Sequence, residues 1–452
     1  MTVGQPGQRG ADPGSARHRA EDAASPVGTA LRLGCIADDF TGATDLANNL
    51  VRGGMRVVQT IGVPAAPVDG VDAVVVALKS RTAPVAQAVA ESLAAARWLR
   101  GQGAPQIFFK VCSTFDSTPQ GNIGPVAEAL LAELDADFAL VTPAFPEAGR
   151  TVFKGHLFVG DQLLSDSPMR QHPLTPMTDA NLVRLLQVQC RRSRVGLVEH
   201  RTVARGAGAV RECIDALRAE GCRLAIADAV DDADLHVLAQ AAQPLKLVVA
   251  GSGLAIGMPA LHGLAPCVAA SLLPPAEGAR AVVSGSCSAA TNAQVADFIA
   301  AGGPAFAVDA LRVAAGYDVA AEALAWAAPR LGGEPLLVYA TAAPDTVRAV
   351  QAKLGSERAG ALVEHTLARV AAGLVDAGVR QLVVAGGETS GACVQALGIT
   401  RLRIGPQIDP GVPWCHAAAS ALGPAMHLAL KSGNFGGVDF FTRAFTVLRV
   451  AQ

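Results

Sequence analysis

IADDFTGATD, residues 36–45, joins an apolar run to a helical pattern and decides how the first part of the chain folds. The apolar run of residues 31–36 is typical of a buried strand, and the helical pattern begins near Ala43. Two adjacent carboxylates, Asp38 and Asp39, therefore stand where the strand ends. This end of a strand is where open α/β sheets bind ligands, but Asp and Thr also cap helices without any ligand. This stretch alone leaves both interpretations open.

The composition excludes several classes of protein. The chain has 452 residues, of which 51% are hydrophobic, enough for large cores and two domains. Its 37 Lys and Arg against 39 Asp and Glu give a net charge of −2, so no overall field attracts nucleic acid or an anionic membrane. Nine scattered cysteines, without a CxxC pair or a Cys/His cluster at metal spacing, indicate reduced thiols in the cytoplasm. We therefore expect a small-molecule partner.

The order of apolar and helical segments predicts an α/β fold in two domains. Each domain is expected to be a largely parallel sheet flanked by helices. No apolar run reaches the length of a membrane span, and residues 1–30 are predicted to be a disordered tail without a secretion signal. The predicted domains are residues 31–270 and 281–452, joined by a linker at residues 271–280. The predicted strands are residues 71–78, 106–111, 138–141, 245–250, 281–283, 335–340 and 381–385, and the predicted helices are residues 84–99, 124–134 and 358–377.

KVCSTFDSTPQGNIGP, residues 110–125, is the richest polar segment of the chain. It joins a strand to a helix and brings together a cation, a carboxylate, hydroxyls and glycines. Lys110 can meet a carboxylate or phosphate, while Asp116 and the hydroxyls can pair with sugar hydroxyls. Arg81, at the end of another strand, offers a fork for a carboxylate. The alternatives are a polar loop that satisfies itself and a solvated surface arginine.

Several stretches resemble the four-carbon acid sugar kinases. They are IADDFTGA at residues 36–43, KSR at 79–81, the polar segment at 110–125, PAFPE at 143–147, TVFKGHLF at 151–158 and RQHPLTPM at 170–177. The resemblance covers nearly everything from Leu31 to the carboxyl terminus. Many relatives read K-x-D-S-T-L-R-G where this chain has CSTFDSTPQG at residues 112–121, a form similar to the branch that phosphorylates 3-oxo-tetronate.

The second half is expected to hold the nucleotide. LVVAGGETSG, residues 382–391, runs from a strand through a glycine pair into a helix, which leaves free amides for phosphate oxygens. A tight strand-to-helix connection is the alternative. VSGSCS at residues 283–288 and KSGNFGG at residues 431–437 also resemble ATP-contacting segments of the family, and no GxxxxGK[ST] motif occurs. The resemblance carries ATP contacts onto Ser286, Ser288, Gly386, Gly387, Glu388, Thr389 and Gly433.

The resemblance implies an ATP-dependent kinase, with Mg²⁺, that phosphorylates the 4-hydroxyl of a 3-oxo four-carbon sugar acid in the cleft between the domains. The catalytic candidates are Asp38, Asp39 and Asp116, and the residues that would hold the metal are not identified. The predicted substrate-binding residues are Arg81, Lys110, Ser113, Gly121 and His156, although a histidine in such a loop is as often structural.

Three alternative functions compete with this one. A D-threonate or D-erythronate kinase is the alternative within the family, and it would also give a 4-phosphate. A nicotinamide-dependent dehydrogenase lacks the expected G-x-G-x-x-G after the first strand. A non-catalytic sugar-acid sensor would need no nucleotide half. Whether the chain forms a homo-oligomer is left open.

Overall fold

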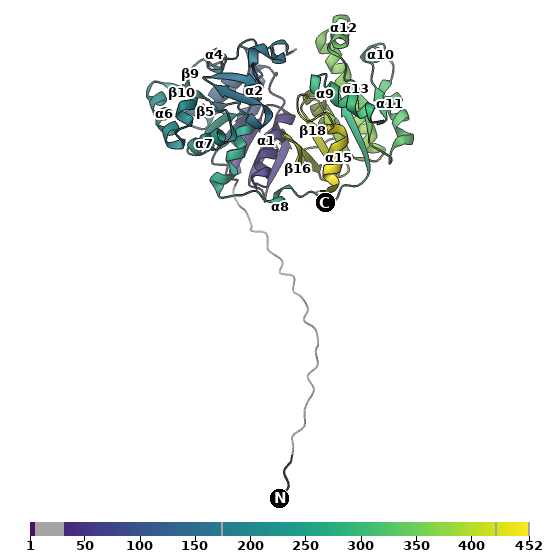
Figure 1. The fold of residues 1–452 in the computed structure, drawn as a ribbon, viewed down its shortest axis with the longest axis horizontal. Helices are drawn as coiled ribbons and strands as arrows, with labels where there is room; N and C mark the ends of the chain where they lie inside the picture. Colours follow the sequence, from purple (N-terminus) through teal and green to yellow (C-terminus); the bar gives the residue numbers. More distant parts are fainter. Residues whose placement is uncertain (5–30, 173–174, 421–422, 451–452) are drawn as a thin grey trace.

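One large sheet runs through the whole molecule (Figure 1). The computed structural model describes residues 1–4, 31–172, 175–420 and 423–450, so the predicted tail lies outside the described residues except for its first four. We call residues 31–270 the first lobe and residues 281–450 the second lobe. The 15 strands of the sheet follow the order β13-β14-β12-β15-β18-β17-β16-β2-β3-β1-β4-β11-β5-β10-β9.

The first lobe is a parallel sheet covered by helices, as predicted. Every residue of β1 and β3 is buried and none is polar, as expected of strands covered on both faces. The strands are β1 (Leu33–Ala37), β2 (Val57–Ile61), β3 (Ala73–Ala77), β4 (Ile107–Lys110), β5 (Ala139–Thr142), β9 (Arg194–Val198), β10 (Cys222–Ala227) and β11 (Leu247–Ala250). The main helices are α1 (Phe40–Arg52), α2 (Val85–Gly101), α3 (Ile123–Glu133), α4 (Leu182–Gln187), α5 (His200–Val203), α6 (Ala207–Ala219) and α7 (Asp232–Ala242).

A second, smaller sheet and several short helical turns complete the first lobe. The small antiparallel sheet contains β6 (Arg150–Phe153), β7 (His156–Val159) and β8 (Gln162–Leu163), and sequence analysis did not predict it. The 3-10 turns are η1 (Pro146–Ala148), η2 (Leu164–Asp166), η3 (Pro168–Gln171), η4 (Ser252–Gly257) and η5 (Pro259–His262). One short helix, α8 (Val268–Ser271), leads into the connection between the lobes.

The second lobe repeats the alternation of strands and helices. Its strands are β12 (Ala279–Ser284), β13 (Ala305–Ala307), β14 (Leu336–Tyr339), β15 (Val379–Ala385), β16 (Arg401–Asp409), β17 (Val412–Ala417) and β18 (Met426–Lys431). Its helices are α9 (Ala289–Ala300), α10 (Ala310–Ala314), α11 (Val319–Ala327), η6 (Ala328–Arg330), α12 (Pro344–Leu354), α13 (Ser356–Asp376), α14 (Gly387–Ala396) and α15 (Phe440–Val450). The strands and helices predicted for this half correspond to β12, β14, β15 and α13.

An antiparallel hairpin joins the sheets of the two lobes. β16 pairs with β17 on one side and with β2 on the other, through Arg401–Thr60, Leu402–Gln59 and Arg403–Val58. Sequence analysis expected a sheet in each domain but not their fusion. Helix α1 lies between the lobes and packs against β16, β17 and α14, so the helix that follows Asp39 belongs to both halves (Figure 1).

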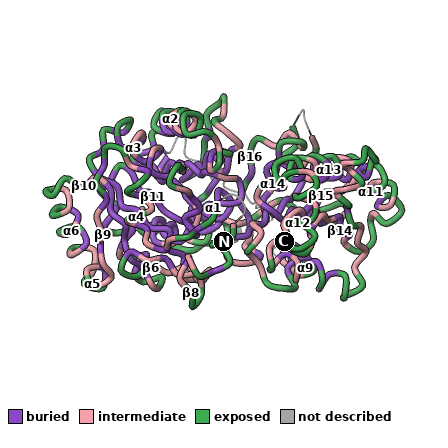
Figure 2. Tube along the Cα trace, turned by 90° about the horizontal axis from the view of Figure 1, so that it is seen from above, coloured by how far each residue is buried: buried purple, intermediate pink, exposed green. Residues whose placement is uncertain are grey.

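Buried residues form a core that extends across both lobes, with exposed residues on the outer helices (Figure 2). A smaller apolar cluster lies beneath α15 and contains Trp414, Phe440 and Phe445. The indole nitrogen of Trp414 donates to the Ala444 carbonyl at 2.8 Å. The hydrogen bond satisfies the one polar group of an otherwise apolar side chain.

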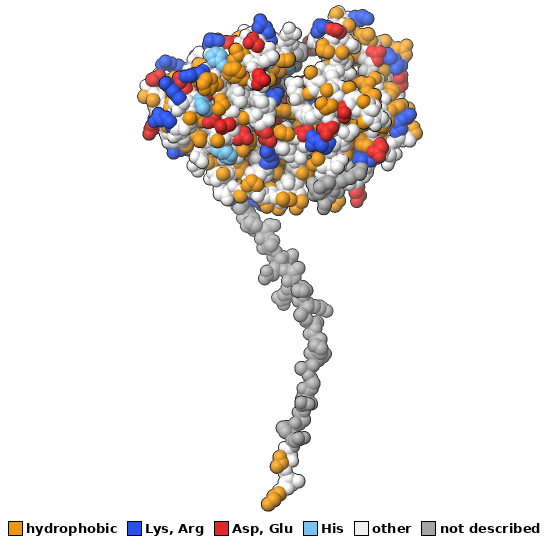
Figure 3. Space-filling view, viewed as in Figure 1, with side chains coloured by type: hydrophobic (Ala, Val, Ile, Leu, Met, Phe, Trp, Pro, Cys, Tyr) orange, Lys and Arg blue, Asp and Glu red, His pale blue; other side chains and the backbone are white. Residues whose placement is uncertain are grey.

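The visible face carries Lys and Arg interspersed with Asp and Glu (Figure 3). This agrees with the net charge of −2 for the whole chain. In the part of the chain that the structure describes, no helix is long and apolar enough to cross a membrane.

Candidate active site

The strands of the first lobe end level with one another. Ala37 of β1 pairs with Ala77 of β3 and with Lys110 of β4, and Lys110 pairs with Ala250 of β11. The residues that follow these strands therefore meet at one edge of the sheet, where parallel α/β sheets bind ligands. The predicted residues Asp38, Arg81, Lys110 and Asp116 all come from this edge.

Arg81 binds both adjacent carboxylates. Its Nε and Nη2 donate to the two carboxylate oxygens of Asp38 at 3.0 and 2.8 Å, and Nη2 also donates to Asp39 at 2.7 Å. The guanidinium of Arg81 was predicted to bind a substrate carboxylate, but in this structure it binds the carboxylate of Asp38. Arg81 therefore neutralises the cluster from within, and its contact with substrate stays a prediction.

Asp39 caps helix α1, which confirms one of the two interpretations of IADDFTGATD. Its carboxylate accepts hydrogen bonds from the Gly42 amide at 2.9 Å and from the Thr41 hydroxyl at 2.8 Å. Burial raises the pKa of this carboxyl, but Arg81, Lys110 and these hydrogen bonds outweigh burial and hold the pKa below its usual value. Asp39 is therefore anionic at neutral pH. The cap and a ligand site are compatible, because the cap leaves the carboxylate at the edge of the sheet.

Asp38 differs from its neighbour. Burial raises the pKa of the Asp38 carboxyl, and the ion pair with Arg81 offsets this only in part. Two carboxylates that adjoin in sequence thus have pKa values shifted in opposite directions. Such a difference is typical of paired acid and base groups in active sites.

Lys110 and Asp45 are buried groups of opposite charge that act on each other electrostatically beside these carboxylates. The Lys110 side chain is almost fully buried, and its Nζ donates to the Val111 carbonyl at 2.7 Å. Burial raises the pKa of Asp45 to about 6, opposed by the nearby Lys110. The Ser252 hydroxyl donates to one oxygen of Asp45, while the other oxygen has no hydrogen-bond partner in the described structure. Sequence analysis did not select Asp45.

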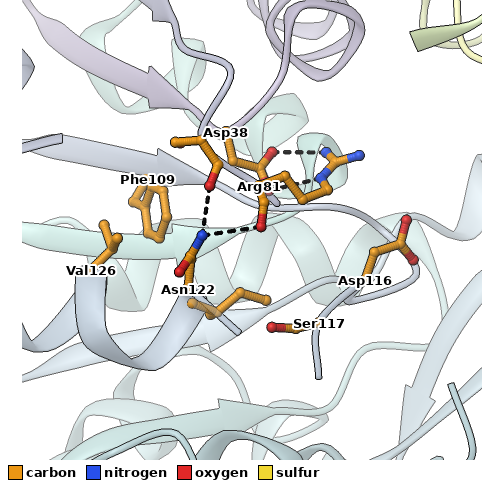
Figure 4. Close-up of a pocket in the computed structure, with 9 residues that line it drawn as sticks. Asp38, Arg81, Phe109, Asp116, Ser117, Asn122 and Val126 are labelled. Atoms are coloured by element: carbon orange, nitrogen blue, oxygen red, sulfur yellow. Dashed lines mark hydrogen bonds and ion pairs between the residues drawn. The ribbon is translucent and has the colours of Figure 1, made fainter. Parts of the chain in front are cut away.

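The polar segment after β4 lines a small pocket with Asp38 and Arg81 (Figure 4). The lining of the pocket includes Asp116, Ser117 and Asn122. Asp116 accepts from the Thr114 hydroxyl at 2.6 Å and from the Cys112 thiol at 3.1 Å. Much of this loop therefore satisfies itself, as the alternative interpretation expected, but it also faces the Asp38 and Arg81 pair.

The remaining predicted substrate residues are Ser113, Gly121 and His156. Ser113 is buried in the turn after β4, and Gly121 packs against the Ser117 hydroxyl in the same segment. His156 lies on the small sheet, where its ring nitrogens contact the Lys154 carbonyl at 2.8 Å and the Asn181 amide at 3.3 Å. These contacts favour the structural role that was the alternative for His156.

In the second lobe, three neighbouring strands also end level. Ser284 of β12 pairs with Ala385 of β15, and Ala385 pairs with Lys431 of β18. The three segments expected to contact ATP follow these strands, so the fold brings them to one edge. These segments are residues 285–288, 386–389 and 432–437.

Hydrogen bonds tie the first of these segments to the third. The Gly433 carbonyl accepts from the Ser288 hydroxyl at 2.5 Å and from the Thr291 hydroxyl at 2.8 Å. A Cβ added at Gly433 would lie 2.5 Å from the Ser286 hydroxyl oxygen, so a side chain there would require the serine hydroxyl to move. Ser286, Ser288 and Gly433 therefore form one contiguous surface.

The second segment contacts the first lobe. Gly386 has φ +121°, which permits the sharp turn into α14, and the next residue, Gly387, begins the helix. A Cβ at Gly387 would lie 3.8 Å from both Asp39 Oδ2 and Thr41 Oγ1. Glu388 pairs with Lys79 of the first lobe at 2.8 Å. The helix N-terminus, a favourable place for phosphate, thus lies directly beside the carboxylate of Asp39.

The carboxylates of the site are suited to a magnesium ion that takes its other ligands from water and phosphate. They are less suited to a metal that is coordinated by protein side chains alone. Among the residues that the structure describes, no three His, Cys, Asp or Glu side chains come together as a metal-binding group. Mg²⁺ is normally held by one or two carboxylates, with waters and substrate phosphates completing its coordination. Asp39, which is anionic and adjoins Gly387, fits that requirement.

Sequence analysis overlooked three charged residues of this region, and each had a recognisable signal. Asp45 is the last residue of IADDFTGATD, and Lys431 is the first residue of KSGNFGG. Arg150 stands between PAFPE and TVFKGHLF, and its guanidinium lies 5.6 Å from the ring centroid of Phe435 in the second lobe. A charged residue inside or beside a segment that follows a strand was the signal available in each case.

Comparison with known proteins gives matches for both lobes. Residues 33–258 match the family described as a sugar-binding N-terminal domain, and residues 281–441 match the family described as a nucleotide-binding C-terminal domain. The chain is 59% identical over 424 residues to a 3-oxo-tetronate kinase of Cupriavidus necator, covering 92% of this chain and 97% of that protein. It is 60% identical over 422 residues to a 3-oxo-tetronate kinase of Burkholderia multivorans, again covering 92% and 97%. The solved structure of the Haemophilus influenzae protein HI1011 matches with a TM-score of 0.73 and 46% identity, over 92% of this chain and 100% of that one.

Proposed function

Because the chain belongs to the four-carbon acid sugar kinase family, we propose that it transfers the γ-phosphoryl group of ATP to the 4-hydroxyl of 3-oxo-tetronate. The product is 3-oxo-tetronate 4-phosphate. The observation that carries this choice of acid is the 59% and 60% identity, over 92% of the chain, to proteins named 3-oxo-tetronate kinase. Membership of a kinase family leaves the dehydrogenase and sensor alternatives without support.

The two lobes divide the work of binding. Residues 31–270 bind the acid at the edge where Asp38, Lys110 and Asp116 gather, and residues 281–452 bind ATP. The closeness of Gly387 to Asp39 supports this division, since a Cβ at Gly387 would lie 3.8 Å from the Asp39 carboxylate and the predicted phosphate-binding amides begin at this residue. In-line transfer needs this proximity, because the attacking oxygen and the phosphorus atom must approach closely.

The carboxylates have separable roles in this proposal. Asp39 stays ionised, lies beside Gly387 and would hold Mg²⁺, which neutralises phosphate charge when it is bound. Asp38 and Asp116 line the pocket, where a carboxylate can take the proton of the attacking hydroxyl. Arg81 keeps Asp38 oriented through two hydrogen bonds.

We also propose that the protein works in a reducing compartment, the cytoplasm, since all nine cysteines are free thiols.

An acid panel tests the substrate. Purified protein is incubated with ATP, Mg²⁺ and one of three acids, 3-oxo-tetronate, D-threonate or D-erythronate, and ADP release is measured. We expect kcat/KM for 3-oxo-tetronate to exceed that for either other acid by at least about 100-fold, because a site whose polar groups match one substrate rejects an analogue that leaves them unpaired. Activity on D-threonate or D-erythronate without activity on 3-oxo-tetronate would overturn the proposed substrate.

A further inference from the structure

Arg150 is held rigidly at the start of the small sheet. It follows the turn η1, and its backbone exchanges two hydrogen bonds with Phe145, at 3.0 and 2.8 Å. This pairing fixes the point from which the side chain leaves the backbone. The guanidinium then extends from the first lobe to Phe435 of the second lobe, with 5.6 Å between Arg150 Cζ and the ring centroid. A cation over an aromatic ring is held in a defined orientation.

The guanidinium has donor capacity that the protein leaves unused. One terminal nitrogen donates to the Ala148 carbonyl. Nε is buried and has no hydrogen-bond partner in the described structure. A buried donor without a partner carries a penalty that is normally avoided, and a ligand that supplies an acceptor would remove it.

Arg150 lies among the charged groups of the first-lobe site. Burial lowers the pKa of its guanidinium, and Cys112, Asp45 and Asp116 oppose that shift. These three side chains come from the segment after β4 and from helix α1. The arginine therefore lies near the predicted acid-binding pocket on one side and contacts the nucleotide lobe on the other.

The other cations at this edge already have partners. Arg81 makes three hydrogen bonds to Asp38 and Asp39. Lys79 pairs with Glu388. A phosphoryl group in transfer spreads negative charge over its peripheral oxygens, and a planar guanidinium is well suited to bind two of them.

We propose that Arg150 is a catalytic residue whose guanidinium donates hydrogen bonds to the γ-phosphoryl group as it passes from ATP to the acid. The inference rests on the proposed function. In the step, the hydroxyl oxygen of the acid forms a bond to the γ-phosphorus while the bond from phosphorus to the β–γ bridging oxygen breaks. ADP leaves with that electron pair, the hydroxyl proton passes to a carboxylate of the site, and Arg150 remains protonated. The contact with Phe435, two residues after Gly433, assigns Arg150 to the phosphoryl group rather than to the substrate carboxylate.

Steady-state kinetics of Arg150→Met provide the first test. We expect kcat to fall by about 10²–10³-fold, the usual loss when one donor to developing charge is removed, with KM for acid and ATP within about threefold of the parent. Arg97→Met is the matched control, because Arg97 is an exposed arginine paired with Glu133 far along helix α2. A raised KM for the acid with unchanged kcat would assign Arg150 to the substrate carboxylate and overturn the proposal.

Calorimetry gives a readout that does not depend on turnover. ADP with aluminium fluoride and the acid mimics the transferring phosphoryl group. We expect the parent to bind ADP more tightly when aluminium fluoride and the acid are present, and Arg150→Met to lose this increase in affinity while it binds ADP alone as the parent does.

A second variant, Arg150→Lys, keeps the positive charge without the planar guanidinium. It should fold and still lose at least about tenfold in kcat. Parental kcat in this variant contradicts the inference. If the parent protein phosphorylates none of the three acids, the proposed function fails; if the parent is active and Arg150→Met is equally active, only this inference fails.

Discussion

Lys110 and Lys431 occupy corresponding places in the two lobes but have opposite surroundings. Each is the last residue of a strand that pairs in parallel with its neighbour, and their side chains are 2% and 0% exposed. Lys110 lies among the carboxylates of Asp38, Asp39 and Asp45, which it affects electrostatically. Lys431 instead donates to uncharged oxygens of its own lobe.

The partners of Lys431 come from the loop that follows it and from helix α9. Its Nζ lies 3.0 Å from the Thr291 hydroxyl and 3.0, 3.1 and 3.2 Å from the carbonyls of Ser432, Gly433 and Phe435. Burial lowers the pKa of Lys431 to about 7, opposed by Asp409. The comparison teaches that one residue type at one place in a sheet can serve two purposes. Lys110 balances the charge of a site, and Lys431 holds the shape of a loop.

The largest effect is expected from Lys110→Met. Removing the cation takes away one of the positive charges that compensate the buried carboxylates, so the free energy of unfolding at pH 8 should fall by about 3–5 kcal/mol. The loss should be smaller at pH 5. Asp45 has a folded-state pKa of about 6, above its ordinary value of 3.8, so it binds a proton below pH 6 and then needs no cation. Urea unfolding at both pH values measures the difference.

The control for this prediction is Lys246→Met, which removes an exposed lysine from a pair with Asp135 at 3.7 Å. Its effect should stay below about 1 kcal/mol at either pH. If Lys110→Met lowered the free energy of unfolding equally at pH 5 and pH 8, Lys110 would not act by compensating the charge of carboxylates. The contrast between the two lysines would then disappear.

A smaller effect, in a different pH range, is expected from Lys431→Met. The folded-state pKa of about 7 lies below the ordinary value of 10.5, so between these values the unfolded chain binds more protons than the folded one. Lys431 therefore makes the parent more stable as the pH rises from about 7 to 10, by at most about 1.4 kcal/mol per pH unit. The variant should lack this rise when unfolding is followed at pH 7, 8 and 9.

The kinetics of the same variant test what Lys431 does for the loop. Loss of its hydrogen bonds frees the loop around Gly433, so KM for ATP should rise about tenfold, the equivalent of one hydrogen bond of about 1.4 kcal/mol. KM for the acid should remain within about twofold. A parallel rise in both KM values would indicate a general structural defect rather than a role in the nucleotide lobe.

The smallest effect is expected from Lys79→Met, a third lysine that follows a strand of this edge. Its ammonium pairs with Glu388 at 2.8 Å, but both side chains are nearly half exposed, at 47% and 46%. Such pairs contribute about 0–1 kcal/mol and weaken in salt. Thermal unfolding at low and high salt measures this contribution. If Lys79→Met lowered the free energy of unfolding by more than about 2 kcal/mol, burial would not explain why the three lysines differ in their contribution to stability.

Much of the fold could be predicted, because strands and helices leave local patterns in the sequence. The apolar run before Asp38 and the glycine pair at Gly386 each predicted a strand end and a following helix correctly. The fusion of the two sheets could not be predicted in the same way. It depends on pairing between β2 and β16, which lie more than 300 positions apart and carry no turn signal that links them.

The candidate site was predictable in its residue types but not in its internal pairing. The sequence placed Asp38, Arg81 and Lys110 at strand ends, and register brings them together. That Asp38 would occupy the fork of Arg81 depends on side-chain geometry, which no local pattern encodes. Arg150 had a local signal, a charge between two family-like segments, but its neighbours in the site could not be predicted, since they come from α1, from the loop after β4 and from the second lobe.

The shared sheet also bears on dividing the molecule. Cutting the chain at residues 271–280 would leave two fragments, one with a free edge on β2 and the other with a free edge on β16, and exposed strand edges pair with other strands. Fragments produced separately should therefore seek each other, which makes this protein a starting point for a split-enzyme reporter. Reassembly would bring Gly387 back beside Asp39 and restore catalysis, so enzyme activity would report that two fused partners had met.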